Sequence, residues 1–238
     1  MAPLGDAALT VVFGDRIDAA SSARARGFCA ALAAAQRPDG LEEWAPAFAS
    51  ATLWYDPEKT SFAALADFCI ELTQRAKPLR QDGLLFEIPF CRDGDLAPDL
   101  VEVARLNGLT PDAYIDAFAS LSLEVFMLGF LPGFAYLGGL PETLSAPRLK
   151  TPRKGVPAGS VAVADGMCAA YPSASPGGWR LIGRTPAPLF FEENSSRPSL
   201  LAPGDRVIWR EIGRQEFDDL ERRWAEGDFH PELLEKTS

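Results

Sequence analysis

The sequence predicts an α+β protein with two domains, a ferredoxin-like α/β domain over residues 1–83 and a β-barrel domain over residues 84–238. Its 238 residues suffice for one large domain or two small ones. The predicted elements of the first part follow the order β-α-β-β-α-β, which is that of a ferredoxin-like split βαβ unit. The second part carries short apolar runs separated by Gly and Pro turns, which is typical of a β-barrel or sandwich.

Local patterns define the elements of the first domain. Phe28 and Leu32 recur at helical spacing, and Ser61 is a candidate N-cap ahead of a second amphipathic segment. The last predicted strand could belong to either domain, because a Pro- and Gly-containing linker precedes it. In order, the predicted elements are a strand at Ala8–Phe13, a helix at Ser21–Ala35, strands at Leu41–Ala49 and Thr52–Tyr55, a helix from Ser61 to about Lys77, and a strand at Leu84–Pro89.

The second domain begins with helices and continues with strands. Two short helices are predicted near residues 97–120, the second announced by Thr110 as cap and Pro111 at the first helical position. An acidic helix over Gln215–Glu226 is expected to dock on the body of the protein through Phe217, Leu220 and Trp224, with a partner-binding helix as the alternative. The strand candidates are Leu121–Leu128, Ser160–Ala164, Trp179–Ile182, Leu189–Phe191 and Arg206–Arg210.

Charge and composition exclude several classes of function. A net charge of −10 argues against nucleic acid and anionic membranes as partners. No apolar run reaches the roughly 18–20 residues of a membrane helix, and no secretory signal is visible. The four cysteines lie far apart without a metal-type pair, so we expect reduced thiols, no bound metal and a cytoplasmic location.

The sequence offers few of the standard catalytic groups. The only histidine is His230, near the C-terminal end of the sequence, which leaves no His-dependent triad and no His-rich metal site. Neither the P-loop pattern nor the dinucleotide-binding glycine fingerprint occurs. No cofactor site is therefore evident in this chain.

Residues 129–186 differ from the rest of the chain, because Gly, Pro and Arg are packed there among aromatic residues. Between Leu140 and Thr185 six Lys and Arg residues stand against Glu142 and Asp165, a local charge of +4 that indicates a small anionic ligand. The alternative is a solvated loop that forms salt bridges with the acidic remainder. The polar candidates are Tyr136, Arg148, Arg153, Lys154, Ser160, Tyr171, Arg184 and Thr185.

Each candidate also has a structural interpretation. Tyr136 and Tyr171 could be half-buried aromatic residues, and Arg184 could pair with a structural carboxylate. Ser160 more often caps a turn than acts as a nucleophile, and Trp179 could equally line a pocket or fill a barrel. Cys168 is more plausible as a small buried residue than as a reactive thiol.

Taken together, these stretches resemble the 5-oxoprolinase B-subunit family. This family is also called allophanate hydrolase subunit 1, includes the inhibitor of a sporulation histidine kinase, and is similar to subdomains C and D of the carboxyltransferase part of urea carboxylase. The matching stretches are GFLPGFAYL at 129–137, Pro147-Arg148, Pro152-Arg153, VPAGSVA at 156–162, Tyr171-Pro172 and SPGGWRLIGRTP at 175–186.

The resemblance implies a cyclophilin-like β-barrel for residues 84–238. It also implies a hydrolase component that is inactive alone and acts with a C-subunit-like protein, and with an A-subunit-like protein, to open 5-oxoproline to glutamate at the expense of ATP. ATP, together with Mg²⁺, could then be bound at a partner subunit. Residue type and family position assign Arg153, Arg184 and Ser160 to catalysis, and Tyr136, Arg148, Lys154, Gly159, Tyr171, Trp179 and Thr185 to substrate binding.

Two departures from the family pattern leave other functions open. Met167-Cys168-Ala169 stands where the family has Gln-Thr-Gly, and residues 115–119 lack the histidine that the family tends to carry. One alternative is a non-catalytic regulator that inhibits a histidine kinase. The other is a carboxyltransferase or allophanate hydrolase-related module of urea metabolism, with biotin supplied by another chain because no Met-Lys-Met attachment site is present.

Overall fold

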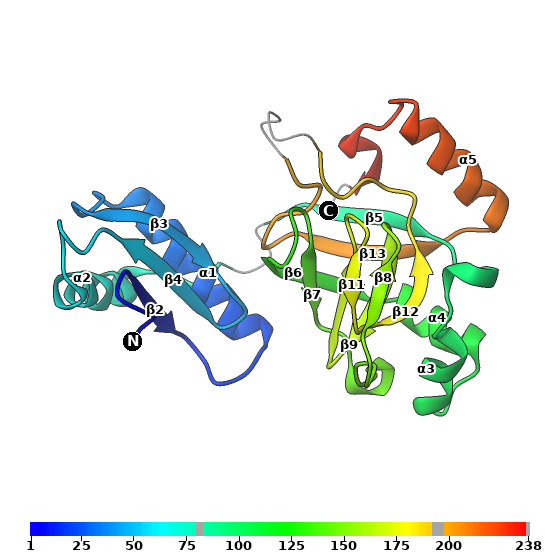
Figure 1. Cartoon of the computed structure of the whole chain (residues 1–238), viewed down its shortest axis with the longest axis horizontal. Helices are drawn as coiled ribbons and strands as arrows, with labels where there is room; N and C mark the ends of the chain where they lie inside the picture. The colour runs from blue at the N-terminus through cyan, green and yellow to red at the C-terminus, as the bar shows by residue number, and fades with distance from the viewer. Residues whose placement is uncertain (80–82, 192–197, 237–238) are drawn as a thin grey trace. The chain divides into compact units, whose positions relative to one another are not determined.

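A computed structural model describes residues 1–79, 83–191 and 198–236 (Figure 1). Contacts divide the chain into two compact units, Met1–Asp82 and Gly83–Ser238. Helices and strands occur in both units, which confirms the α+β class.

The first unit is a four-stranded antiparallel sheet with two helices packed against it (Figure 1). Leu9, Phe28, Leu53 and Leu65 meet in its core, because alternate strand positions and one stripe of each helix face inward. The elements are β1 Ala2–Pro3, β2 Ala8–Val12, α1 Ala19–Ala34, β3 Leu41–Pro46, β4 Ser50–Tyr55 and α2 Phe62–Arg75.

Side-chain caps start both helices of this unit. Asp18 accepts a hydrogen bond from the Ser21 backbone N–H at 2.8 Å, and Ser61 accepts one from the Ala64 N–H at 3.2 Å. The Ser61 cap confirms the predicted start of α2. Helix α1 begins two residues before the predicted Ser21, because the Asp18 carboxylate reaches a free N–H of the first turn.

The strand order β1-β2-β4-β3 differs from a complete β-α-β-β-α-β unit in one position. The place beside β2, where the last strand of that unit would pair, is occupied by the two residues of β1. The predicted strand at 84–89 lies instead in the second unit, as β5 Leu85–Phe90. Its parallel partner is far away in the sequence, at β13 Arg206–Glu211, and no local pattern could reveal that.

The second unit is built on an eight-stranded sheet of order β12-β9-β10-β7-β6-β13-β5-β14 and a two-stranded sheet β11-β8. β5 and β13 are parallel, and the other paired strands are antiparallel. The other strands are β6 Ser122–Leu128, β7 Ala135–Gly138, β8 Arg153–Val156, β9 Ser160–Ala164, β10 Met167–Ala170, β11 Ser175–Gly177, β12 Arg180–Arg184 and β14 Glu235–Lys236. The helices are η1 Gly94–Leu96, α3 Leu100–Leu106, α4 Pro111–Ala119, η2 Glu142–Leu144, α5 Arg214–Ala225 and η3 Pro231–Leu234.

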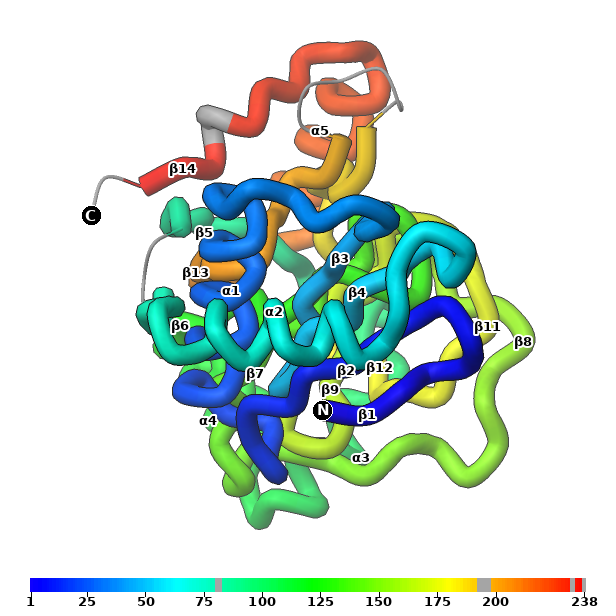
Figure 2. Tube along the Cα trace, turned by 90° about the vertical axis from the view of Figure 1, so that its left-hand side faces the viewer, coloured from blue at the N-terminus to red at the C-terminus, as the bar shows by residue number. Residues whose placement is uncertain are grey.

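The large sheet is not closed into a barrel within the described residues. After α5 the chain turns back, and β14 pairs with Leu85 and Phe86 of β5 (Figure 2). This pairing covers only the start of β5, and one isolated β-bridge between Cys91 and Arg184 joins the chain after β5 to β12. The predicted barrel is therefore an open sheet within the described residues, with β12 at one edge and β14 at the other. The predicted strand at 189–191 contributes only an isolated bridge, Phe190 to Ser199.

The inserted helices fill the core of the second unit. Tyr114 and Phe118 of α4 are fully buried, and Phe118 stacks on Trp209 with ring centroids 6.4 Å apart. Thr110 accepts a hydrogen bond from the Ala113 N–H, and Pro111 is the first helical residue, as predicted. Helix α5 docks on the same unit through buried Phe217 and Trp224, which confirms the docking interpretation.

Asp205 fastens the start of β5 to the turn before β13. Its carboxylate accepts hydrogen bonds from the backbone N–H groups of Leu84 and Ala202, each at 2.8 Å. Asp205 is only 3% exposed, so these charge-assisted bonds lie in a desolvated turn.

Candidate functional site

The second unit contains a pocket of about 240 Å³ with aromatic walls. We call it the aromatic pocket. It combines four of the residues predicted to bind substrate, Tyr136, Arg148, Tyr171 and Trp179, with six others: Phe130, Phe134, Pro152, Pro176, Gly177 and Gly178. The Gly- and Pro-rich run of the sequence therefore does form a cavity.

Strand alternation explains which side of the sheet bears the pocket. In β7, Ala135 and Leu137 belong to the main core, and Tyr136 between them points to the opposite face. In β10, Cys168 belongs to the core, and Ala169 pairs with Tyr136. The aromatic pocket thus lies across the sheet from the core that holds α4.

Phe134 organises the pocket walls. Its ring centroid lies 4.9 Å from that of Tyr136, 5.1 Å from that of Tyr171 and 6.2 Å from that of Trp179. The contacts to Tyr171 and Trp179 are edge-to-face, a favourable arrangement of ring quadrupoles. Phe134, Tyr171 and Trp179 are at most 5% exposed, so these walls are held by packing within the protein.

Only glycine fits at position 177 without displacing its neighbours. A Cβ atom at this position would lie 2.3 Å from the Tyr171 hydroxyl oxygen, well inside any normal contact. Absence of a side chain at Gly177 therefore lets the phenol of Tyr171 reach the pocket wall. Burial raises the pKa of the Tyr171 phenol, and likewise that of Tyr136, so both remain protonated hydrogen-bond donors at neutral pH.

Arg148 supplies the positive charge of the pocket. Its guanidinium carbon lies 5.7 Å from the ring centroid of Trp179, and its Nε lies 2.9 Å from a carboxylate oxygen of Asp165. Both partners of this ion pair are more than half exposed, so the pair is weak. The guanidinium has donors beyond Nε, and a ligand carboxylate could compete with Asp165 for them.

The structure gives Arg153 a partner within the protein. Its Nη2 lies 2.7 Å from Oδ1 of Asp99, and its Nη1 donates to the Trp179 carbonyl at 3.4 Å. Asp99 is 7% exposed and also accepts a hydrogen bond from the Leu181 N–H at 2.7 Å. Arg153 does not line the aromatic pocket, and this geometry favours a role in positioning β12 and the Trp179 wall.

Four further predicted residues gather at a second place, which we call the glycine junction: Gly159, Ser160, Arg184 and Thr185. Ser160 and Thr185 are 3% and 2% exposed, and Thr185 Oγ1 accepts a hydrogen bond from the Ala187 N–H. Gly159 has a φ of +77°, and a Cβ there would lie 2.3 Å from the Thr185 carbonyl oxygen. The junction does not line the aromatic pocket.

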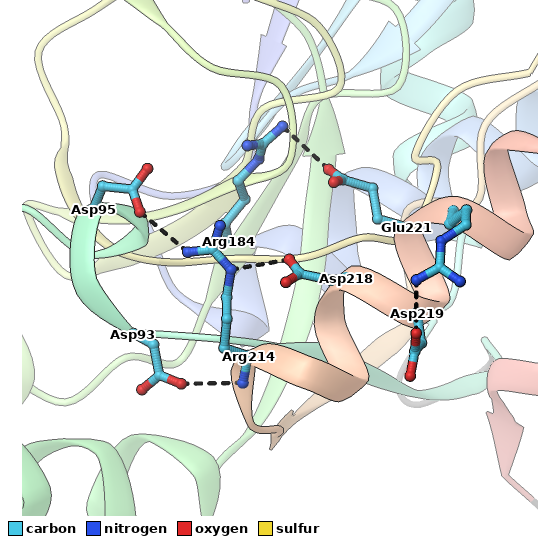
Figure 3. A network of polar contacts seen from close by, with 8 residues as sticks. Asp93, Asp95, Arg184, Arg214, Asp218, Asp219 and Glu221 are labelled. Carbon is cyan, nitrogen blue, oxygen red and sulfur yellow. Dashed lines mark hydrogen bonds and ion pairs between the residues drawn. The ribbon is translucent and has the colours of Figure 1, made fainter.

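Arg184 faces α5 rather than the aromatic pocket (Figure 3). Its Nε donates to the Ala158 carbonyl at 2.8 Å, and its Nη2 lies 3.4 Å from Oε1 of Glu221. Its guanidinium carbon also lies 6.0 Å from the ring centroid of Phe217 in that helix. The structural-carboxylate interpretation of Arg184 therefore fits the observed contacts.

An acidic network holds the start of α5 beside η1 (Figure 3). The Arg214 backbone N–H donates to Asp93 at 3.0 Å, and its guanidinium contacts Asp218 at 2.9 Å and Asp95 at 3.1 Å. The hydrogen bond from Arg214 lowers the pKa of the Asp95 carboxyl. These contacts replace the missing side-chain cap of α5, whose N-cap residue is glycine.

The remaining predictions are placed as follows. Lys154 is exposed on β8 and does not line the pocket. Met167, Cys168 and Ala169 lie in β10 and are at most 6% exposed, so the departure from the family pattern lies in a strand rather than at a pocket mouth. Burial raises the pKa of the Cys168 thiol, which suits the small buried residue expected there.

Two aromatic pocket residues, Phe130 and Phe134, were not among the predicted site residues. The sequence pattern that could have identified them is the GFLPGF run at 129–134, in which each of two aromatic residues directly follows a glycine. In the described part of the chain, no group of three His, Cys, Asp or Glu side chains is placed to hold a metal ion. Among the described helices, none is long and apolar enough to cross a membrane.

Comparison with known proteins places this architecture in a family. The profile of the carboxyltransferase domain, subdomains C and D, matches residues 1–201. The 5-oxoprolinase B-subunit of Bacillus subtilis (strain 168) is 36% identical over 225 residues, which cover 90% of this chain and 93% of that protein.

Solved structures contain a similar fold. The crystal structure of TTHA0988 matches 86% of this chain with a TM-score of 0.73 and 35% identity, and this chain spans only 40% of TTHA0988. The Kluyveromyces lactis urea amidolyase matches 94% of this chain with a TM-score of 0.79 at 18% identity, which shows a shared fold over 15% of that enzyme. Because the family profile covers most of the chain and the Bacillus relative aligns along nearly its whole length, the chain belongs to the 5-oxoprolinase B-subunit family.

Proposed function

We propose that this chain is part of a 5-oxoprolinase-type hydrolase, and that it binds the substrate while partner subunits supply the activation chemistry. The observation that carries the proposal is the near full-length similarity to a protein named as the B-subunit of a 5-oxoprolinase. A protein of this name belongs to an assembly, and we propose a C-subunit-like and an A-subunit-like protein as its partners.

The aromatic pocket suits the chemistry of 5-oxoproline. This compound is a five-membered lactam with one carboxylate, a small body with a planar amide and a single negative charge. Buried aromatic faces can contact the ring, and Arg148 can pair with the carboxylate. The protonated phenols of Tyr136 and Tyr171 can donate to an oxygen of the ligand.

The pocket does not supply the rest of the reaction. Its lining contains two phenols and a guanidinium, and neither a carboxylate, a histidine nor a thiol that could act as base or nucleophile. Opening a stable lactam needs an activated carbonyl, which phosphorylation by ATP would provide. We therefore propose that ATP and Mg²⁺ bind at a partner subunit and that this chain contributes orientation and charge stabilisation.

Reconstitution tests this proposal. The chain is purified with its candidate partners, supplied with 5-oxoproline, ATP and Mg²⁺, and assayed for glutamate and ADP. We expect turnover in the full assembly and none when this chain is left out. An assembly that forms but produces no glutamate, together with tight binding of this chain to a histidine kinase, would replace the enzyme proposal with the regulatory one.

A further inference from the structure

Phe130 adopts an unusual backbone conformation at the mouth of the aromatic pocket. Its φ is +69°, and a hydrogen bond of 2.8 Å from the Leu131 N–H to the Gly129 carbonyl closes a three-residue turn around it. A γ-turn with positive φ is rare and strained, and a bulky residue at its centre is an outlier. Glycine would adopt this φ at no steric cost.

Packing does not explain why phenylalanine stands there. Phe130 is 61% exposed, so little of its apolar surface is removed from water. Its ring contacts Phe134 edge-to-face, with centroids 5.3 Å apart and an angle of 82° between the planes. A strained residue that buries little surface points to a functional reason for its side chain.

The exposed residues that line the pocket mouth, which we call the rim, indicate why a phenylalanine stands at this position. Phe134, Tyr171 and Trp179 are buried walls, whereas Phe130 and Arg148 are exposed lining residues. The other exposed members of the lining are prolines, which offer neither a flat face nor a charge. A ligand that enters here meets an aromatic ring and a guanidinium together. That pair of groups selects a ligand that has both a flat face and an anionic group.

We propose that Phe130 is a specificity-determining residue whose ring covers the planar face of a small ring carboxylate, such as the amide plane of a lactam, while Arg148 holds the carboxylate. This inference rests on the proposed function for its location and adds the ligand class that the rim selects. The strained turn presents the ring at the pocket mouth.

Binding of pyrrole-2-carboxylate, a planar five-membered ring with one carboxylate, tests the inference on the full chain by calorimetry. Phe130→Ala and Phe130→Gly should each weaken binding about threefold to tenfold, which is the range of a lost aromatic contact. Phe130→Leu should weaken it similarly, because an apolar but non-planar group replaces the ring. Phe130→Tyr should restore affinity to within about twofold, and Lys150→Ala, at an exposed residue outside the pocket, should leave it unchanged.

Thermal unfolding separates this role from a structural one. Phe130→Gly should melt above Phe130→Ala, because both lack the ring and only glycine relieves the positive φ. It should also melt no more than about 2 °C below the wild type. Cyclopentane carboxylate, whose ring is puckered, should bind the wild type more weakly than pyrrole-2-carboxylate and should be insensitive to Phe130→Leu.

Three results would overturn the inference: wild-type affinity in Phe130→Leu, a large drop in melting temperature in Phe130→Gly with binding lost in proportion, or no binding of pyrrole-2-carboxylate by the wild type. Turnover of 5-oxoproline in the reconstituted assembly is scored separately. Ring-dependent binding without turnover would reject the proposed hydrolase function and support the rim role of Phe130.

Discussion

The aromatic pocket and the glycine junction come from the same Arg- and Gly-rich run, yet they differ in what their polar groups contact. In the pocket, Arg148 makes a weak, exposed ion pair beside an open volume. At the junction, Arg184 contacts the Ala158 carbonyl and Glu221, and Thr185 is buried with its hydroxyl engaged. Residue type alone therefore indicates that a group can bind an anion, and the partners that the fold provides determine whether it is available to do so.

The largest expected effect is at the junction, from Gly159→Ala. The new Cβ would meet the Thr185 carbonyl oxygen at 2.3 Å, and the φ of +77° disfavours alanine in any case. We expect a loss of about 3 kcal/mol in the free energy of unfolding, measured by denaturant titration. Gly155→Ala is the matched control, because a Cβ there meets nothing within 4 Å. Equal stability of the two variants would refute the assignment of the junction to structure.

Arg153→Met should destabilise the fold without acting on the pocket directly. It leaves the carboxylate of Asp99, 7% exposed, without its ion-pair partner. We expect a cost of about 2 kcal/mol in the free energy of unfolding, since the abandoned group stays desolvated. The double variant Asp99→Asn/Arg153→Met should recover part of this loss. A catalytic Arg153 would instead show wild-type stability with lost turnover.

Arg148→Gln should show the opposite pattern. Because the Arg148 ion pair is exposed, stability should change by less than about 0.5 kcal/mol. Affinity for a carboxylate ligand should fall about tenfold or more, the usual value of a charge-assisted hydrogen bond. Calorimetric titration measures this, with Lys150→Gln as the control for loss of one exposed cation from the same run. An equal loss of affinity in both variants would indicate a general effect of net charge rather than a specific contact of Arg148.

The smallest effect is the pH dependence of α5 docking. Arg214 lowers the folded-state pKa of Asp95 from an ordinary value of 3.8, so its contribution is present above the unfolded pKa and is lost as pH falls through the folded pKa. Unfolding measured from about pH 5 down to about pH 2 should show less loss of stability in Asp95→Asn than in the wild type. Identical acid profiles would show that the Asp95–Arg214 contact contributes nothing measurable.

The parts of the structure that could be predicted depend on neighbours in the sequence. The caps of α2 and α4 follow from Ser61 and Thr110, whose side chains bond to N–H groups three residues ahead. The gathering of Tyr136, Tyr171 and Trp179 was expected from the composition of one run. Alternation along β7 and β10 then fixes the face on which these rings meet.

The parts that could not be predicted depend on contacts between distant segments. Asp99 meets Arg153 across 54 residues, and Leu84 meets Asp205 across 121, with no local pattern to announce either pair. The last pairing of the large sheet likewise depends on β14, two residues near the C-terminal end of the sequence. A resemblance to a family suggested which residues matter, but only the fold separates those that line the pocket from those that hold it together.

The position of β5 has a mechanical consequence. A pulling force applied at the start of β5 would act first on the hydrogen bond from the Leu84 N–H to Asp205. Beyond this bond, β5 is paired with β13 in parallel over six residue pairs, so a load directed along the strand would strain all six pairs together. In the unit that carries the aromatic pocket, β5 would therefore be the first strand to bear such a load.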